Sequence, residues 1–380
     1  MTGSRPRVLF VGRARLRFPL GQTLERRFEA LDAELDWRQL GTLAGGQAPP
    51  DSRFVLGRPF PVRKLDGPLY YLALPGRIAR ELRRFEPEVV IAQGAQETAL
   101  ALLARGLARS RARVILDLHG DWRSPTRLYG SRARRLLDPL ADALARLALR
   151  GADAVRTISE YTTGLVRERG IEPAAEFPAY MDLEPFTAQP VVPLPAAPRV
   201  LFVGVLERYK AFDVLVHAWR LVAAARPEAV LQVVGQGSLA PVAASLAAEL
   251  PGHVEWTPVL SAPEVSAALD ASTLLVLPSR AEGMGRVLVE AACRGRAVVG
   301  SRVGGIPDVV ADGETGLLVP PADARALADA LERVLSDLAL AERLGAEARI
   351  RVEPWLATPE EYARRVRALV DQVVTLGIID

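Results

Sequence analysis

The chain has 380 residues, 49% of them hydrophobic and 24% charged, which is typical of soluble globular proteins and excludes disordered, collagen-like and disulfide-rich ones. Its length exceeds one ordinary core and predicts two domains. The net charge of +3 is unevenly divided, because residues 1–190 carry 30 Lys and Arg against 22 Asp and Glu, and residues 191–380 carry 18 against 23. This asymmetry suggests that the two halves have different partners.

The N-terminal segment has only a short apolar run between arginines. A secretory signal needs an apolar stretch of about 7–15 residues, and a membrane-spanning helix needs about 20. We therefore expect a cytoplasmic protein that meets a membrane, if at all, peripherally at the inner face of the cell membrane.

A short repeat opens the two halves of the chain. The string Pro6-Arg7-Val8-Leu9-Phe10-Val11-Gly12 recurs from Pro198 to Gly204. Such an apolar run ending in glycine is typical of a buried parallel strand that runs into a turn. The repeat therefore predicts two domains built alike, each starting on a central strand.

Further strands and helices alternate along both halves. Strand-like runs occur at 88–92 and 114–118, and again at 231–235, 274–278 and 297–300, with helix-like runs at 213–225, 263–270 and 286–294. This alternation predicts an α/β protein with two Rossmann-like, doubly wound parallel-sheet domains facing across a cleft. We place the domains at 1–185 and 199–357, joined by a stiff proline-rich linker at 186–198.

The C-terminal segment predicts a helix over 358–376. Thr358 is suited to cap it, Pro359 to occupy its first position and Glu361 to close a capping box. Two interpretations remain open: the helix packs on the second domain, or it crosses back onto the first.

The most informative turn is Pro278-Ser279-Arg280-Ala281-Glu282-Gly283-Met284-Gly285, which follows a buried strand and opens a helix containing Glu290. Free amides at a helix start bind phosphate, and carboxylates accept hydrogen bonds from hydroxyls. A nucleotide sugar carries both groups. Neither Gly-x-Gly-x-x-Gly after the first strands nor a P-loop occurs, which argues against dinucleotide enzymes and P-loop proteins.

No metal or other cofactor is expected. The sequence offers no cluster of metal ligands, because its single cysteine is Cys293 and its histidines, His119, His217 and His253, are widely separated. It also contains no Asp-x-Asp pair.

The stretch from Pro278 to Asp323 resembles the donor site of the retaining glycosyltransferases of family 4, which have the GT-B fold. The matching features are Pro278-Ser279, Glu282-Gly283, Glu290-Ala291, Gly295, Gly304-Gly305 and Asp312-Gly313 with Gly316-Leu317-Leu318-Val319. Val203-Gly204 with Lys210, Ala154 to Ser159, and Pro178 to Phe186 also fit, so the resemblance spans most of the chain.

The resemblance implies roles for individual residues. Glu282 would hold the hydroxyls of the donor sugar, Glu290 those of the ribose, and the amides of Gly283, Met284 and Gly285 the phosphates. Lys210 would bind the diphosphate. Where the family has an arginine after the strand-end glycine, this chain has Val205, and Arg208 is the candidate replacement.

Two first-domain residues complete the set of candidates. His119 follows the strand at 114–118 and matches the family's cleft histidine, although a lone histidine is more often structural. Gly21 matches an N-terminal glycine loop only weakly, because the usual paired glycines are missing.

The implied activity is metal-independent, retaining transfer of a hexosyl group from a nucleoside diphosphate-sugar to a hydroxyl acceptor that is lipid-linked, polysaccharide or small molecule. His119, Lys210 and Glu282 are the predicted catalytic residues. Two alternatives stay open: a non-catalytic nucleotide-sugar-binding protein, favoured by Val205, and a phosphorylase or epimerase of the same fold.

Basic stretches of the first domain suggest where an acceptor or an anionic membrane surface binds. The alternative is an ordinary solvated face. No nucleic-acid partner is expected, because no nucleic-acid-binding motif accompanies the modest excess charge. The stretches comprise Leu69-Tyr70-Tyr71-Leu72 with Arg77, Arg80, Arg83 and Arg84, and Arg123, Arg127, Arg132, Arg134, Arg135, Arg146 and Arg150 with Trp122, Leu128 and Tyr129.

Overall fold

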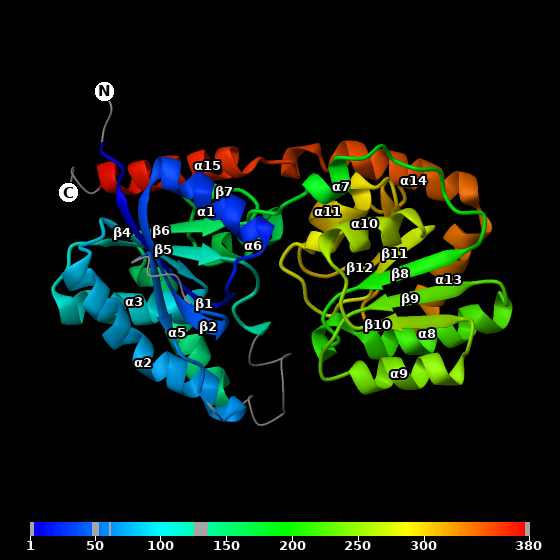
Figure 1. Ribbon diagram of the computed structural model, residues 1–380, viewed down its shortest axis with the longest axis horizontal. Helices are drawn as coiled ribbons and strands as arrows, with labels where there is room; N and C mark the ends of the chain where they lie inside the picture. The colour runs from blue at the N-terminus through cyan, green and yellow to red at the C-terminus, as the bar shows by residue number, and fades with distance from the viewer. Residues whose placement is uncertain (1–3, 48–52, 61, 125–135, 377–380) are drawn as a thin grey trace. The chain divides into compact units, whose positions relative to one another are not determined.

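The computed structural model describes residues 4–47, 53–60, 62–124 and 136–376, which form two compact units (Figure 1). The first unit contains the described residues up to Arg123, 136–181 and 357–376, and the second contains Ser124 with 182–356. Each unit has one sheet in which every pairing of neighbouring strands is parallel. The predicted α/β class with two Rossmann-like sheets is confirmed.

The first unit contains a seven-stranded sheet in the order β3-β2-β1-β4-β5-β6-β7. Its strands are β1 (Arg7–Arg17), β2 (Asp36–Gly45), β3 (Phe54–Gly57), β4 (Val89–Gln93), β5 (Arg113–Leu118), β6 (Ala154–Thr157) and β7 (Ala175–Glu176). Its helices are α1 (Gln22–Glu34), α2 (Arg63–Arg84), α3 (Ala95–Ala108), α5 (Asp138–Gly151), α6 (Glu160–Arg167) and α15 (Pro359–Leu376).

Strand β1 does not turn at Gly12, as the apolar run predicted, but continues to Arg17. The neighbouring β2, with ten residues, is also long and pairs with this extension, with Arg15 opposite Thr42 and Leu16 opposite Leu43. A register shift after Val11 allows the continuation. An irregularity of this kind is set by the partner strand, so the apolar run alone could not reveal it.

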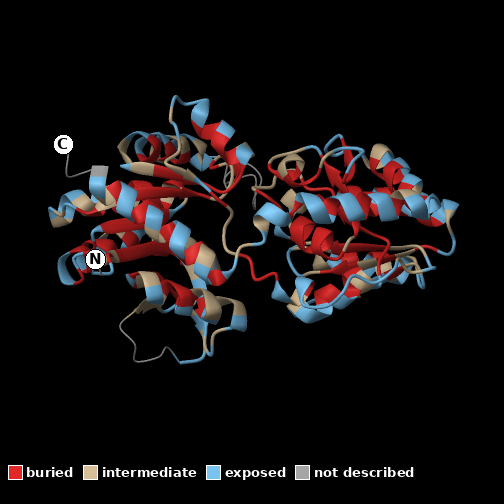
Figure 2. Cartoon of the chain, turned by 90° about the horizontal axis from the view of Figure 1, so that it is seen from above, coloured by how far each residue is buried: buried red, intermediate tan, exposed pale blue. Residues whose placement is uncertain are grey.

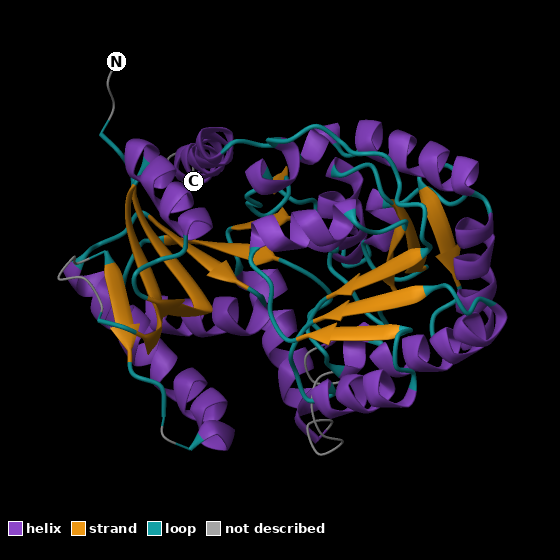
Figure 3. Cartoon of the chain, turned by 45° about the vertical axis from the view of Figure 1, so that its right-hand side comes forward, coloured by secondary structure: helices purple, strands orange, loops and turns teal. Residues whose placement is uncertain are grey.

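Helices cover both faces of the first sheet, as Figure 3 shows. Alternate residues of a strand point to opposite faces. Leu9, Val11 and Val114 therefore pack with α2 and α3, while Val8, Phe10 and Ile115 pack with α1 and α15. Helix α5 lies on the same face as α3, against Leu116 and Leu118.

The second unit contains a six-stranded sheet in the order β10-β9-β8-β11-β12-β13, whose central strands are buried in Figure 2. The strands are β8 (Arg199–Val203), β9 (Val230–Val234), β10 (Val254–Thr257), β11 (Leu274–Leu277), β12 (Ala297–Ser301) and β13 (Gly316–Val319). The α-helices are α7 (Glu184–Thr187), α8 (Phe212–Ala225), α9 (Ala240–Glu249), α10 (Ala262–Asp270), α11 (Arg286–Cys293), α12 (Ile306–Val309), α13 (Ala324–Ser336) and α14 (Leu338–Arg351). The short 3-10 turns are η2 (Arg208–Lys210) and η3 (Glu353–Trp355).

The C-terminal helix α15 packs on the first unit, beside α1 (Figure 1). Its predicted start is confirmed: the Glu361 amide donates to Thr358 Oγ1 at 3.2 Å, and the Thr358 amide donates to a Glu361 carboxylate oxygen at 3.0 Å. Its buried face, which includes Tyr362, Val366 and Val370, joins the core formed by β1, β4 and α1.

The proline-rich segment after α7 is held on the second unit by two fully buried arginines. Arg294 donates to the carbonyls of Gln189 at 2.7 Å and Pro190 at 2.8 Å, and Arg296 donates to that of Val192 at 2.9 Å. Both arginines also lie near Asp270, which forms a bidentate pair with Arg294 at 2.7 Å. Composition predicted a stiff segment, but not the buried charges that fix it.

No helix in the described part of the chain combines the length and apolar character needed to cross a membrane.

Candidate functional site

In the second unit, two chain segments meet beyond the carboxyl ends of neighbouring strands. Strands β8 and β11 are paired, so the segments that follow them emerge at the same edge of the sheet. One segment contains η2 with Lys210, and the other contains residues 278–285 with Glu282. Ligands of open α/β sheets bind at this edge.

Lys210 and Glu282 form an ion pair between Lys Nζ and Glu Oε2. Their side chains are only 11% and 15% exposed, so the pair is largely shielded from water. Ser279 Oγ lies 3.4 Å from the same carboxylate oxygen. The structure therefore brings together two of the residues that the sequence singled out, although they are 72 positions apart.

Arg280 links these two segments. Its guanidinium donates to both carboxylate oxygens of Asp213 at 2.7 Å and to the Arg208 carbonyl at 2.9 Å. Its amide donates to the Tyr209 carbonyl at 2.7 Å. The hydrogen bond and charge of Arg280 hold the pKa of Asp213 below its usual range, which keeps the pair ionised. This contact was not predicted, because nothing in the spacing indicates that positions 213 and 280 meet.

The turn at the start of α11 is packed backbone against backbone. Gly285 is the N-cap and adopts a left-handed φ of +85°. The Gly305 amide donates to the Glu282 carbonyl at 3.0 Å. A Cβ on Gly304 would lie 2.0 Å from the Glu282 oxygen, and one on Gly305 would lie 2.2 Å from the Gly283 oxygen. Glycines at both positions therefore fix the position of the turn.

Glu290 lies within α11 and is 7% exposed. Burial raises the pKa of its carboxyl above the ordinary value, while the charge and hydrogen bond of Arg286, whose Nε lies 2.5 Å from Oε1, oppose the rise. Met284, within the turn, is also buried. A buried carboxyl group beside a turn of buried and half-buried residues is suited to accept hydrogen bonds from a bound hydroxyl compound.

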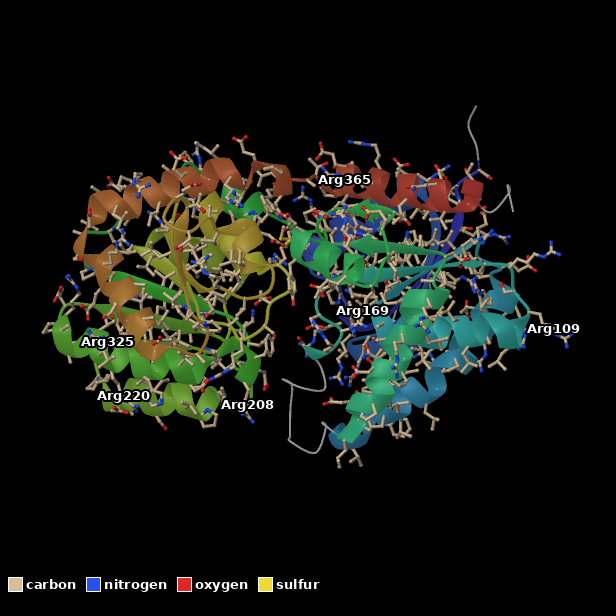
Figure 4. The ribbon with its side chains drawn as sticks, turned by 180° about the vertical axis from the view of Figure 1, so that it is seen from behind. Arg109, Arg169, Arg208, Arg220, Arg325 and Arg365 are labelled. Atoms are coloured by element: carbon tan, nitrogen blue, oxygen red, sulfur yellow. The ribbon has the colours of Figure 1, made fainter. Side chains whose placement is uncertain are left out.

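Arg208 does not join the ion pair of Lys210 and Glu282. Its side chain is exposed, and Figure 4 places it at the surface of the second unit. Val205 is 46% exposed. The proposed replacement of the missing arginine by Arg208 therefore stays a prediction, and reaching a ligand would require the Arg208 side chain to reorient.

In the first unit, His119 lies just beyond β5 in a network of polar groups. His119 Nε2 donates to Asp117 Oδ2 at 2.9 Å, and Gln93 Nε2 donates to His119 Nδ1 at 3.1 Å. Arg156, almost fully buried, donates from Nη1 to Asp117 Oδ1 at 2.6 Å and stacks 4.0 Å above the Phe177 ring. Burial alone would raise the pKa of Asp117, but its interactions with Arg156 and His119 outweigh burial and hold the pKa well below its usual range.

The fixed carboxylate of Asp117 orients the imidazole of His119 and favours the tautomer with hydrogen on Nε2. Sequence reasoning missed both Asp117 and Gln93. A signal was present, because Asp117 lies two residues before the histidine and Gln93 lies opposite Asp117 at the end of the neighbouring strand β4.

Gly21 is exposed and precedes α1 as its N-cap, with an ordinary φ of −71°. No atom lies within 4 Å of the position that a Cβ would occupy there. Neither its conformation nor its surroundings require glycine, so the structure gives Gly21 no distinguishing feature.

Several residues predicted to present an aromatic docking surface are instead inside the first unit. Tyr70 and Trp122 are buried, and Tyr70 donates to the Gly12 carbonyl at 2.7 Å. Tyr71 donates to Glu97 at 2.8 Å. The surface prediction is wrong for the buried rings of Tyr70 and Trp122, whereas Tyr71 is half-buried and Leu72 of the same stretch is exposed. Arg127, Leu128, Tyr129, Arg132, Arg134 and Arg135 lie outside the described residues.

Within the described ranges, no three His, Cys, Asp or Glu residues gather as metal ligands would. The expectation that no metal takes part stays a prediction.

Two family models match the chain. "Glycosyl transferases group 1" matches residues 197–337, and "Glycosyl transferase 4-like domain" matches residues 24–178, so that together they span most of the sequence. The chain is 32% identical over 245 residues to the D-inositol 3-phosphate glycosyltransferase of Nocardioides sp.. That alignment covers 58% of this chain and 54% of the relative, so the chain spans about half the length of the curated relative it matches.

Solved structures support the same fold. The sucrose-phosphate synthase of Thermosynechococcus elongatus aligns with a TM-score of 0.78 at 22% identity, over 98% of this chain and 100% of that one. HepE of Anabaena, solved in complex with UDP-glucose, aligns with a TM-score of 0.69 at 19% identity, over 95% of this chain and 99% of that one.

Proposed function

The chain belongs to the glycosyltransferases of family 4, and on that premise we propose that it transfers a hexosyl group from a nucleoside diphosphate-sugar to a hydroxyl acceptor. The observation that carries this proposal is the shielded Lys210–Glu282 pair beside the glycine-containing turn at the start of α11. A cation, helix-start amides and two carboxyl groups together suit a ligand that carries both phosphates and hydroxyls.

Each group has a role in this proposal. Lys210 and the amides of Gly283, Met284 and Gly285 stabilise the negative charge that develops on the departing diphosphate. Glu282 holds hydroxyls of the donor sugar and Glu290 those of the ribose. UDP-glucose is the first donor to test, because the structurally similar HepE was solved with it.

We propose that transfer retains the anomeric configuration and requires no metal. Fixed cations and amides at the diphosphate then supply the electrostatic stabilisation, and the departing phosphate helps to deprotonate the acceptor on the same face of the sugar. His119, which Asp117 and Gln93 hold on the first unit, is the third proposed catalytic residue. The acceptor itself is lipid-linked, polysaccharide or small molecule.

A non-catalytic nucleotide-sugar-binding protein is the second candidate. Val205 stands where the family has a cation, and Arg208 makes no contact with Glu282. Fewer cations at the diphosphate would weaken transition-state stabilisation more than ground-state binding.

A turnover assay with radiolabelled UDP-glucose tests the proposal. The chain is expected to release UDP and to form labelled product with acceptors that carry hydroxyl groups, in the presence of a chelator as well as without one. Lys210→Ala and Glu282→Ala are expected to abolish release while far-UV circular dichroism stays unchanged. Unchanged turnover in either variant would contradict the site. Nucleotide binding without turnover of any donor tested would favour the non-catalytic candidate.

A further inference from the structure

One face of the first unit exposes apolar side chains that its core does not use. Every large apolar side chain that is exposed among the described residues of this unit belongs to α2, α3 or α5, or to the segment directly before one of these helices. Scattered exposed leucines are normal, but their confinement to one helical layer is not. These side chains are Phe60, Val62, Leu72, Leu103, Leu107, Leu136, Leu137, Leu140 and Leu147.

Helix α5 gives the clearest case. Leu140 and Leu147 are 59% and 51% exposed, and a spacing of seven residues places them on the same side of a helix. The opposite side of α5 already supplies the core contacts, through Ala145, Ala148 and Leu149. The exposed leucines therefore contribute nothing to packing within the unit.

The exposed charges of the same layer are all positive. Among the side chains described in α2, α3 and α5, every exposed charged residue is an arginine, while Asp66, Glu81 and Glu97 are buried and Asp138 and Asp142 are half-buried. The next exposed acidic residues are Glu86 and Glu88, which follow α2 and contact Arg7, and Asp153, which follows α5 and pairs with Arg105 and Arg113. The exposed arginines of the helices are Arg80, Arg83, Arg84, Arg146 and Arg150, and Arg109 follows α3 (Figure 4).

The opposite face of the sheet differs in its exposed charges and in its exposed apolar side chains. Helices α1 and α15 expose Glu25, Glu29, Glu360 and Asp371 beside Arg364 and Arg365, and no large apolar side chain is exposed on their described residues. The arginine and leucine surface is therefore a property of one face and not of the arginine-rich composition as a whole.

We propose that the face formed by α2, α3 and α5 docks on an anionic lipid bilayer. Arginines would contact the headgroups while the leucines enter the boundary between headgroups and acyl chains. Nucleic acid would satisfy the arginines but leave the leucines in water. Self-association would bury the leucines but bring like charges together. Only an anionic surface with an apolar interior complements both sets of side chains.

Docking does not depend on the proposed transfer. If the chain is also a glycosyltransferase, docking would select lipid-linked acceptors over polysaccharide and small-molecule ones. That further step rests on the proposed function.

Co-sedimentation of the full chain with vesicles tests the proposal. The wild type is expected to bind phosphatidylcholine vesicles that contain phosphatidylglycerol, to bind them less as salt is added, and not to bind pure phosphatidylcholine. Arg146→Gln/Arg150→Gln should weaken the partition coefficient about 30-fold, since each cation near such a surface contributes about 1 kcal/mol. Leu140→Gln/Leu147→Gln should weaken it at least about tenfold, because the apolar insertion is lost.

The matched control is Arg364→Gln/Arg365→Gln, which removes the same charge from α15 on the opposite face (Figure 4 labels Arg365) and should change binding less than about twofold. Wild-type protein that stays in the supernatant at low salt, or a control that loses as much binding as the α5 variants, would overturn the proposal. A concentration-dependent dimer that Leu140→Gln/Leu147→Gln dissociates, without vesicle binding, would assign the face to a second copy instead. Nucleotide-dependent stabilisation of the α5 variants reports separately on the proposed function.

Discussion

At the scale of single residues, the second unit places carboxyl groups of two different kinds beside one turn. Glu282 is ion-paired with Lys210, whereas Glu290 is buried and its pKa is raised by that burial. A buried carboxylate whose charge is only partly compensated is unfavourable for folding. A ligand hydroxyl that donates to the Glu290 carboxylate would offset part of this cost.

Glu290→Gln is expected to separate binding from stability. The folded state holds the Glu290 proton more tightly than the unfolded chain does, so this group favours folding most at acidic pH, and that contribution is lost as pH rises from 4.5 through the raised pKa. Relative to wild type, the variant should therefore gain stability between acidic and neutral pH, while it loses nucleotide binding. Urea unfolding at acidic and at neutral pH measures the change in stability. Calorimetric titration with UDP measures the loss of nucleotide binding.

Glu342→Gln, an exposed position on α14, is the control and should show neither effect. Stability of Glu290→Gln that falls relative to wild type as pH rises would contradict the account of burial.

Gly305→Ala tests the packing of the turn. The added Cβ would lie 2.2 Å from the Gly283 carbonyl oxygen, so the turn that supplies the amides must shift. Nucleotide affinity should fall roughly tenfold or more, as expected for displaced binding groups. Gly106→Ala, on α3 with no atom within 4 Å of its Cβ position, should leave affinity unchanged. Isothermal titration calorimetry of both variants with nucleotide measures this affinity. A normal nucleotide affinity of Gly305→Ala would exclude the turn from the site.

At the scale of elements, two arginine contacts organise the second unit. Arg280 ties the turn after β11 to η2 and to the first turn of α8. Arg294, at the end of α11, ties the proline-rich segment to α10 through Asp270. The first contact is partly exposed and positions the candidate site, whereas the second is buried and holds the unit together.

Arg280→Met should weaken nucleotide binding without unfolding the protein. Loss of its contacts frees η2, so Lys210 spends less time in the binding position, and affinity should fall about tenfold. In a Lys210→Ala background the same substitution should have no further effect, because it acts through Lys210. Arg220→Met, which removes a comparable bidentate pair with Glu249 elsewhere in the unit, is the control. Additive losses in the double variant would contradict the positioning role.

Arg294→Met should instead destabilise the fold. Removing the buried Arg294 guanidinium takes the closest donor from Asp270, which keeps Arg296 at 3.6 Å, and leaves two backbone carbonyls without theirs, at a cost of about 1–3 kcal/mol for each buried acceptor without a donor. Urea unfolding followed by circular dichroism measures this loss. Arg220→Met is again the control and should unfold at nearly the wild-type urea concentration, since its pair is exposed. Equal midpoints for the two variants would show that the buried contact contributes little.

At the scale of the whole molecule, the repeated strand and the alternation of strands and helices were enough to predict two similar parallel sheets. The apolar runs that became β4, β5, β9, β11 and β12 are buried central strands, and such strands are recognised by continuous hydrophobicity alone. The capping box at Thr358 was equally local and was predicted correctly.

What the sequence could not reveal depends on contacts between distant residues. Strands β2, β3 and β7 lie toward the edge of the sheet, and no continuous apolar run marks them, because β2 has polar residues and glycines along its length and β3 and β7 are short. The meeting of Arg280 with Asp213, and of His119 with Asp117 and Gln93, follows from strand order. Lys210 and Glu282 were predicted individually from a family resemblance, whereas their direct pairing required the fold.

The most direct test of the central claim is thermal unfolding with UDP, GDP, ADP and dTDP and their common sugar conjugates, for wild type, Lys210→Ala, Glu282→Ala and the control Arg220→Met. A nucleotide at about 100 times its dissociation constant adds about 2.7 kcal/mol to the stability of the folded state, enough for a shift of several degrees. We predict that the nucleotides of one base raise the unfolding temperature of wild type and control but not of Lys210→Ala, and that Glu282→Ala loses the additional shift that the sugar conjugate gives. A wild type that no nucleotide stabilises, or an equal shift in Lys210→Ala, would contradict the assignment of the donor site.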